Sequence, residues 1–214
     1  MPAISNVVLE CQSIGVQIDG KWLLNPFTFT LSSGELMVLG GHNGAGKSTL
    51  LNAIVGLVGS VGQILWMGEE LSHLPPWQRV KKGIVLLSQQ SMGFNELTLR
   101  QNIMMSGIDT AAYADLISRC GLLPFENRKW ADLSGGERKR AEIARTLALM
   151  PRLWLLDEPF ASLDTEHVEW MLKILREEQL NGAAIIVSDH QSEIHWTPED
   201  RTIVLSNGSV VRQS

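Results

Sequence analysis

The segment GGHNGAGKST has the residue types and spacing of a phosphate-binding loop. Gly41 and Gly46 enclose four residues, and Lys47 and Ser48 follow directly. Glycines let backbone N–H groups turn toward phosphate oxygens, lysine reaches the β- and γ-phosphates, and the serine hydroxyl can hold Mg²⁺. An apolar run precedes the loop and an apolar-periodic helix follows it, as this motif requires. We therefore predict an ATP- and Mg²⁺-binding loop formed by Gly41, His42, Asn43, Gly44, Ala45, Gly46, Lys47, Ser48 and Thr49, with the His42 side chain facing solvent.

Two adjacent carboxylates, Asp157 and Glu158, end the apolar run LWLLDE. Successive residues of a strand point to different sides, so the two groups can take different tasks. We expect Asp157 to hold Mg²⁺, directly or through water. Glu158 is expected to orient and polarise an attacking water as general base.

A second glycine motif, LSGGERKR, opens a basic, alanine-rich segment of helical character. The free N–H groups and the positive dipole end of a helix beginning at Ser134, Gly135 and Gly136 would favour a phosphate. The basic run 138–140 is interpreted as a solvated face of this helix and not as a phosphate contact.

Short apolar runs alternate with helical patterns along the second half of the chain. This order is typical of an α/β protein with a mostly parallel sheet, whereas the early runs are typical of antiparallel strands. Asn207-Gly208 between two β-rich runs predicts a hairpin. A polar, helix-prone stretch at about 90–145 indicates a helical subdomain inserted in a single 1–214 domain. The predicted strands lie at 7–11, 27–31, 36–40, 63–67, 83–88, 153–157, 183–189 and 201–206, and helical patterns cover 136–150 and 165–180.

Bulk composition excludes several classes of protein. A hydrophobic content of 44% with 19% charged residues describes a globular chain, and the net charge of -5 argues against nucleic acid as a partner. Cys11 and Cys120 fit no metal or redox motif and are expected to be free thiols. The most apolar long window is broken by polar residues and glycines, so we expect a chain that is soluble by itself.

Together these motifs resemble those of ABC-type ATPases. The resemblance rests on Gly41–Thr49, on LSGGE at 133–137, on LLDEP at 155–159, on SLD at 162–164 and on a late histidine in VSDH. It implies that Gln89 links the Mg²⁺ site to the helical subdomain, with Gln90 as the alternative. It also implies that His190 is the switch histidine that contacts the γ-phosphate, with His195 as the alternative.

Two positions depart from the usual family pattern. An aromatic residue usually stacks on adenine where this chain has Ile18, and the nearest aromatic residue is Trp22. Weaker selectivity for adenine is therefore a hypothesis. Glu137 stands where the family often has glutamine.

The resemblance also implies partners. The signature Ser134-Gly135-Gly136 would close over ATP held by a second copy, which makes a homodimer the expected state. The leading interpretation is the ATPase subunit of a transporter, held on the cytoplasmic face of the inner membrane by a separate permease that contacts roughly Ser91–Asn102. A soluble ATPase, for example of the iron–sulphur assembly type, is the alternative. The motifs are similar to those of both importers and exporters, so substrate and direction stay open.

Overall fold

Two β-sheets and a set of helices make up the computed structural model, which describes residues 6–89, 93–161, 163–190, 196–197 and 199–214. The first sheet has the order β2-β1-β4-β5, with antiparallel pairing throughout. Its strands are β1 (Val7–Ile18), β2 (Lys21–Ser32), β4 (Val61–Trp66) and β5 (Glu69–Glu70).

The hairpin between β1 and β2 is longer than the sequence predicted. Asp19 and Gly20 form its turn with φ of 49° and 77°, the left-handed pair that favours an Asp-Gly sequence in a two-residue hairpin. An Asp-Gly dipeptide predicts a tight turn, so it indicates that both strands continue up to residues 19 and 20.

The second sheet has the order β10-β9-β3-β8-β7-β6. Neighbours from β9 to β6 are parallel, and β10 returns antiparallel to β9 through the predicted turn, where Asn207 and Gly208 have φ of 48° and 76°. The strands are β3 (Leu36–Gly40), β6 (Ile84–Leu87), β7 (Leu153–Asp157), β8 (Ala184–Ser188), β9 (Arg201–Ser206) and β10 (Ser209–Gln213).

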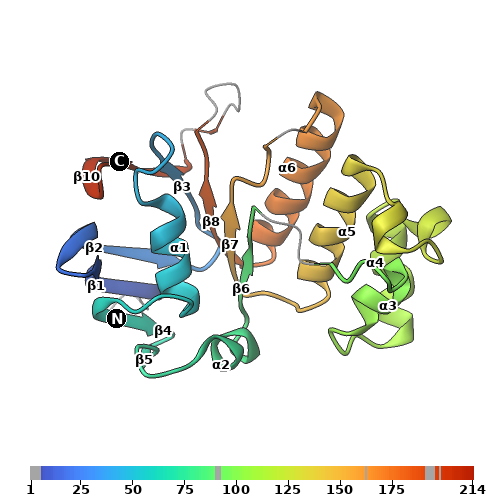
Figure 1. The fold of residues 1–214 in the computed structure, drawn as a ribbon, viewed down its shortest axis with the longest axis horizontal. Helices are drawn as coiled ribbons and strands as arrows, with labels where there is room; N and C mark the ends of the chain where they lie inside the picture. Colours follow the sequence, from blue (N-terminus) through green and yellow to red (C-terminus); the bar gives the residue numbers. More distant parts are fainter. Residues whose placement is uncertain (1–5, 90–92, 162, 191–195, 198) are drawn as a thin grey trace.

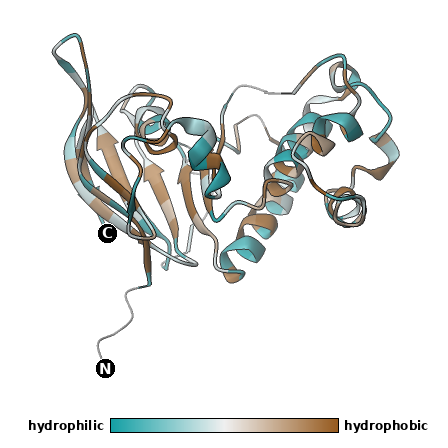
Figure 2. Cartoon of the chain, turned by 90° about the horizontal axis from the view of Figure 1, so that it is seen from below, coloured by the Kyte–Doolittle hydropathy of each residue, from teal (hydrophilic) through white to brown (hydrophobic). Residues whose placement is uncertain are grey.

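The parallel strands are buried on both faces, and alternate side chains enter two different cores. Leu153 and Leu155 of β7 pack with helix α1 (Lys47–Val55), which lies between the two sheets. Trp154 and Leu156 of the same strand pack on the opposite side. Burial on both faces explains why these strands are continuously apolar, and Figure 2 shows them mostly brown.

Helices cover the second face of the parallel sheet and extend away from it (Figure 1). They are α3 (Leu99–Met104), α4 (Thr110–Arg119), α5 (Gly135–Leu147) and α6 (Thr165–Leu180), with 3₁₀ turns at Leu123–Phe125 and Trp130–Asp132; α2 (Pro76–Lys81) lies before β6. The predicted fold class is confirmed: a mostly parallel α/β core, an N-terminal antiparallel sheet and a helical part. Across the described residues, no helix is long and apolar enough to span a lipid bilayer.

Candidate active site

Four neighbouring parallel strands deliver the predicted chemistry to one edge of the sheet. The phosphate loop follows β3, and Asp157 and Glu158 end and follow β7. Asp189 and His190 follow β8, and Gln89 comes two residues after β6. Ligands of open α/β sheets bind at the carboxyl ends of the strands, and here residues far apart in sequence meet there.

The phosphate loop depends on glycine backbone conformations. Gly41, Gly44 and Gly46 have φ of 137°, 80° and 110°, a region that residues with a Cβ rarely adopt. A Cβ on Gly41 would also collide with the carbonyl oxygen of Leu205. The loop leads into α1, so the amide groups of the first turn of α1 open toward the loop. The His42 side chain is exposed, as predicted, and its Nδ1 lies 2.8 Å from the carbonyl oxygen of Asn43.

Lys47 lies between the loop and the acidic strand end. Its Nζ donates to the carbonyl oxygens of Gly41 and His42 over 2.7 and 3.2 Å. The same Nζ lies 3.8 Å from Oε1 of Glu158, and the lysine side chain is only 3% exposed. A buried cation is thereby held against the carboxylate that was predicted to be the general base.

Glu158 is the point where the predicted catalytic side chains converge. Its carboxylate accepts a hydrogen bond from Gln89 Nε2 over 3.3 Å, and His190 Nδ1 lies 3.5 Å from its Oε1. Its φ of 48° is uncommon for a residue with a Cβ, and such strain persists where surrounding bonds enforce it. The structure thus brings Lys47, Gln89, Glu158 and His190 together.

Ser188 binds the backbone of Glu158, a role that the sequence did not predict. Its hydroxyl donates to Asp157 Oδ1 over 2.7 Å and accepts from the Glu158 N–H over 2.8 Å, and the residue is fully buried. The end of β8 therefore fixes the end of β7. The only signal in the sequence was a hydroxyl residue two positions before His190.

A cleft of about 340 Å³ lies over the phosphate loop. Its walls include Ser48 and Thr49 from α1 together with Gln89 and Glu158. These hydroxyl, amide and carboxylate oxygens are donors that Mg²⁺ prefers in phosphate-binding sites. Asp157 lies behind them, mostly buried and bonded to Ser188, which suits a ligand that acts through water. The residues present therefore fit Mg²⁺ bound together with substrate phosphates.

Among the described residues, no aromatic side chain lines the phosphate-loop cleft. Ile18 is half exposed at the end of β1. Trp22 packs against Gly15, where an added Cβ would lie 3.0 Å from its ring. Leu23, the next residue, lines the phosphate-loop cleft instead. Leu23 is thus a site residue that sequence reasoning missed, since attention to aromatic residues pointed to its neighbour.

The signature motif caps α5 and lies in a different cleft. Ser134 is the N-cap, its Oγ accepts from the Glu137 N–H, and the Glu137 carboxylate accepts from the Ser134 N–H over 2.8 Å. The hydrogen bond from the Ser134 N–H is the main cause of a lowered pKa of Glu137, and Arg128 and Arg140 contribute to it. Gly135 and Gly136 line a cleft of about 280 Å³, to which Gln89 also contributes. The phosphate loop is not among the residues that line this second cleft.

Arg138 has a task that the sequence did not predict. Its Nη2 donates to the carbonyl oxygens of Ala131 and Leu133, 3.2 Å away in each case. Arg138 therefore holds the segment that leads into the signature motif. The interpretation of 138–140 as only a solvated face is wrong for Arg138, since its side chain bonds to this backbone.

Some predictions fall on residues outside those that the structure describes. These are the alternatives Gln90 and His195, Ser162 of the SLD motif, and residues 91–92 of the predicted permease-contacting segment.

Known proteins with similar sequences and structures identify the family of this chain. Residues 24–161 match the family model of the ABC transporter family. The lipopolysaccharide export system ATP-binding protein LptB of Haemophilus influenzae is 32% identical over 95% of this chain and 89% of its own. The hemin import ATP-binding protein HmuV of Deinococcus radiodurans is 33% identical over 97% and 84%. A solved dimeric ATP-binding cassette bound to ADP and Pi has the same fold, with a TM-score of 0.85 and 24% identity over 96% of this chain and 97% of that one.

The chain belongs to the ABC transporter family, and it is an ATP-binding ATPase subunit of that family. This confirms the resemblance drawn from the motifs. The individual roles of the site residues, and Mg²⁺, stay predictions that the geometry supports.

Proposed function

We propose that this chain dimerises head-to-tail around two ATP molecules and thereby drives transport through a separate membrane permease. One observation carries the proposal: the phosphate loop and the signature motif line two different clefts of the same chain. A helix start with glycines and open N–H groups is suited to phosphate, yet it is not part of the chain's own phosphate-loop cleft. A second copy would present its signature to the ATP held by the first.

Within one copy, positioning and charge neutralisation account for most of phosphoryl-transfer chemistry. Lys47 and the first amides of α1 would bind the β- and γ-phosphates. Ser48, Gln89 and Asp157 would hold Mg²⁺, which neutralises phosphate charge when bound. Glu158, fixed by Ser188, would accept a proton from the attacking water, and His190 would contact the γ-phosphate.

The signature of the second copy would add the positive end of α5 to the same phosphates. ATP would then be part of the dimer interface, and its hydrolysis would release that interface. Preferential binding of ATP to the closed dimer is the step that converts ATP binding into motion.

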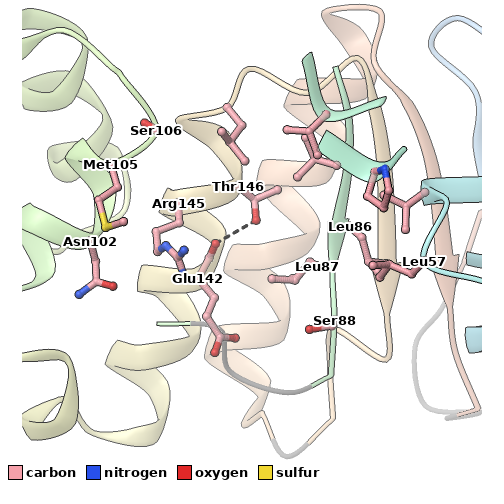
Figure 3. Close-up of a pocket in the computed structure, with 15 residues that line it drawn as sticks. Leu57, Leu86, Leu87, Ser88, Asn102, Met105, Ser106, Glu142, Arg145 and Thr146 are labelled. Atoms are coloured by element: carbon pink, nitrogen blue, oxygen red, sulfur yellow. Dashed lines mark hydrogen bonds between the residues drawn. The ribbon is translucent and has the colours of Figure 1, made fainter. Parts of the chain in front are cut away.

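A groove of about 430 Å³ beside the sheet-edge strand β6 is the proposed permease contact (Figure 3). One side of the groove is formed by Leu57, Leu86 and Leu87. The other side includes Asn102, which is in α3, and Met105, which caps the end of α3. Leu57 and Met105 are about three-fifths exposed, at 60% and 59%, and exposed apolar clusters mark interaction surfaces. The groove ends at Ser88, next to Gln89, so an occupant would touch the connection to the catalytic cleft.

An element of an integral membrane permease is the occupant we propose, since the similar proteins are ATP-binding subunits of export and import systems. The chain would then lie peripherally on the cytoplasmic face of the inner membrane. By their names, the two relatives act in opposite directions, one in export and the other in import. An iron–sulphur assembly ATPase stays the alternative, and it would place a soluble partner in the groove.

Dimerisation is tested with Glu158→Gln, which keeps the shape of the side chain and removes the base. We expect hydrolysis to fall at least about 100-fold, the usual loss of a general base, and a stable dimer to form with Mg²⁺ and ATP. Light scattering with and without ATP measures the dimer. A variant that stays monomeric at saturating ATP would refute the head-to-tail dimer.

Ser134→Asp in the same background supplies the matched control. Aspartate caps a helix as well as serine, so α5 should stay intact, while its negative charge opposes a phosphate at the signature. We expect ATP binding to the monomer to be unchanged and the dimer to be lost.

The permease contact is tested by purifying the tagged chain from its native membranes. We expect an integral membrane protein to accompany it, and Met105→Asp to abolish that association while leaving the ATPase activity of the isolated chain unchanged. Leu180→Asp, at an exposed position outside the groove, is the control. Association with a soluble partner alone would favour the alternative function.

A further inference from the structure

His167, in the first turn of α6, contacts two residues: Asp164, just before that helix, and Gly136 of the signature motif. Its Nδ1 lies 2.6 Å from Oδ1 of Asp164, and its backbone N–H donates to the same oxygen over 2.9 Å. These bonds lower the pKa of Asp164, and its carboxylate holds the Nδ1 edge of the ring. The ring orientation is therefore set, and Nε2 is the atom left to face outward from this pair.

The other end of the ring rests on the signature motif of the same chain. A Cβ added at Gly136 would lie 2.7 Å from Nε2 of His167, whereas at Gly135 it would meet nothing within 4 Å. Gly136 has an ordinary helical backbone, so φ does not explain a glycine here. The space that His167 occupies does explain it, and the first turns of α5 and α6 meet at this contact.

Two backbone hydrogen bonds are formed in the stretch between Glu158 and Asp164. Ala161 N–H donates to the Glu158 carbonyl oxygen, and Leu163 N–H donates to that of Phe160, over 3.2 Å each. The Asp164–His167 pair reaches Gly136 from the end of this stretch.

We propose that His167 is a positioning residue that couples the start of α6, at Asp164, to the signature that the chain offers to the second copy. The inference rests on the proposed head-to-tail dimer. It assigns His167 no contact with the chain's own ATP, because His167 lies in the signature cleft and not in the phosphate-loop cleft.

The test adds His167 variants to the Glu158→Gln chain. His167→Ala should raise the ATP concentration for half-maximal dimerisation about tenfold, since small misplacements of positioned groups are costly. ATP affinity of the monomer, measured with a fluorescent nucleotide, should not change. His73→Ala, which removes an exposed histidine elsewhere, is the control and should dimerise like the parent.

Two further variants separate the two contacts of the ring. His167→Asn keeps a donor for Asp164 but cannot reach Gly136, and His167→Phe keeps the ring on Gly136 but has no donor. We expect both to dimerise less well than the parent, with thermal unfolding close to it. If either variant dimerises like the parent, one contact alone suffices and the coupling is refuted.

A spectroscopic measurement reports on the contact directly. With ¹⁵N-labelled histidine, the Nε2 resonance of His167 should shift when ATP and Mg²⁺ produce the dimer, and should stay in place in the monomeric Ser134→Asp control. A dimer without that shift would overturn the inference. Absence of a dimer in the Glu158→Gln parent would instead refute the proposed function, so the two failures are distinct.

Discussion

At the scale of single residues, the site depends on a serine at the end of the strand next to β7. Ser188 joins Asp157 and Glu158 through one hydroxyl and holds Glu158 in a left-handed backbone. That backbone turns the carboxylate toward Lys47, Gln89 and His190. The orientation of the predicted base is therefore enforced from a neighbouring strand.

Removing that hydroxyl should affect chemistry more than binding. For Ser188→Ala we expect kcat to fall about 10- to 100-fold, because a misoriented base loses part of its effect, while KM changes little. Steady-state ATPase kinetics measure both. Ser206→Ala, a half-buried serine at the end of β9, is the control, and equal kcat in the two variants would contradict this role.

At the scale of elements, α1 is fixed at both ends. Its first residue is Lys47, in the phosphate loop, and its last turn is bound by Arg79 from α2. Arg79 Nη1 donates to the carbonyl oxygens of Ala53 and Ile54 over 3.0 and 2.8 Å, and Nε donates to that of Leu74 over 2.9 Å. A buried cation thus donates to carbonyl groups at a helix end, where the Ala53 oxygen also accepts from the Gly56 N–H over 3.1 Å.

Arg79→Met should destabilise the whole domain, because the methionine fills much of the space but removes the Arg79 donors from the carbonyl oxygens of Ile54 and Leu74. Bonds to charged groups contribute about 1.5–3 kcal/mol, so we expect the free energy of unfolding to fall by about 2–3 kcal/mol. Urea unfolding measures it. Lys81→Met, at an exposed position of the same helix, should change little.

At the scale of the whole molecule, an ion pair joins helix α6 to the residue directly before strand β9. Arg176 of α6 donates to Asp200 over 2.6 Å, and the Asp200 side chain is only 1% exposed. Thr197 N–H and Oγ1 donate to the same carboxylate. Burial alone would raise the pKa of Asp200, but the bonds from Arg176 and Thr197 outweigh it, so the pKa lies below its ordinary 3.8.

A lowered folded-state pKa predicts a definite pH dependence of stability. The contribution of Asp200 is fully present above its unfolded pKa near 3.8, and it is lost as the pH falls through the lower folded value. At neutral pH, Asp200→Asn should cost about 2 kcal/mol, between the values for exposed and buried pairs. Unfolding measured from pH 7 downward should show this difference shrinking below about pH 4, and a constant difference would contradict the assignment.

Local patterns were enough for much of the site. The phosphate loop, the carboxylates after β7, the capped start of α5 and the Asn207-Gly208 turn each depend on neighbouring residues, because glycine conformations and strand ends are local properties. The same is true of the continuous apolar strands. The family followed from the order and spacing of these motifs.

Only the tertiary structure decided which side chains contact residues from other parts of the chain. Ser188 on Glu158, Leu23 in the phosphate-loop cleft, Arg79 on the end of α1 and His167 on Gly136 all join residues that are distant in sequence or that differ only in the direction of a side chain. Spacing cannot show such contacts, since they depend on strand order and helix packing. The separation of the phosphate loop and the signature into two clefts is of this kind, because it arises only once β6, β7 and the first turns of α5 and α6 are placed.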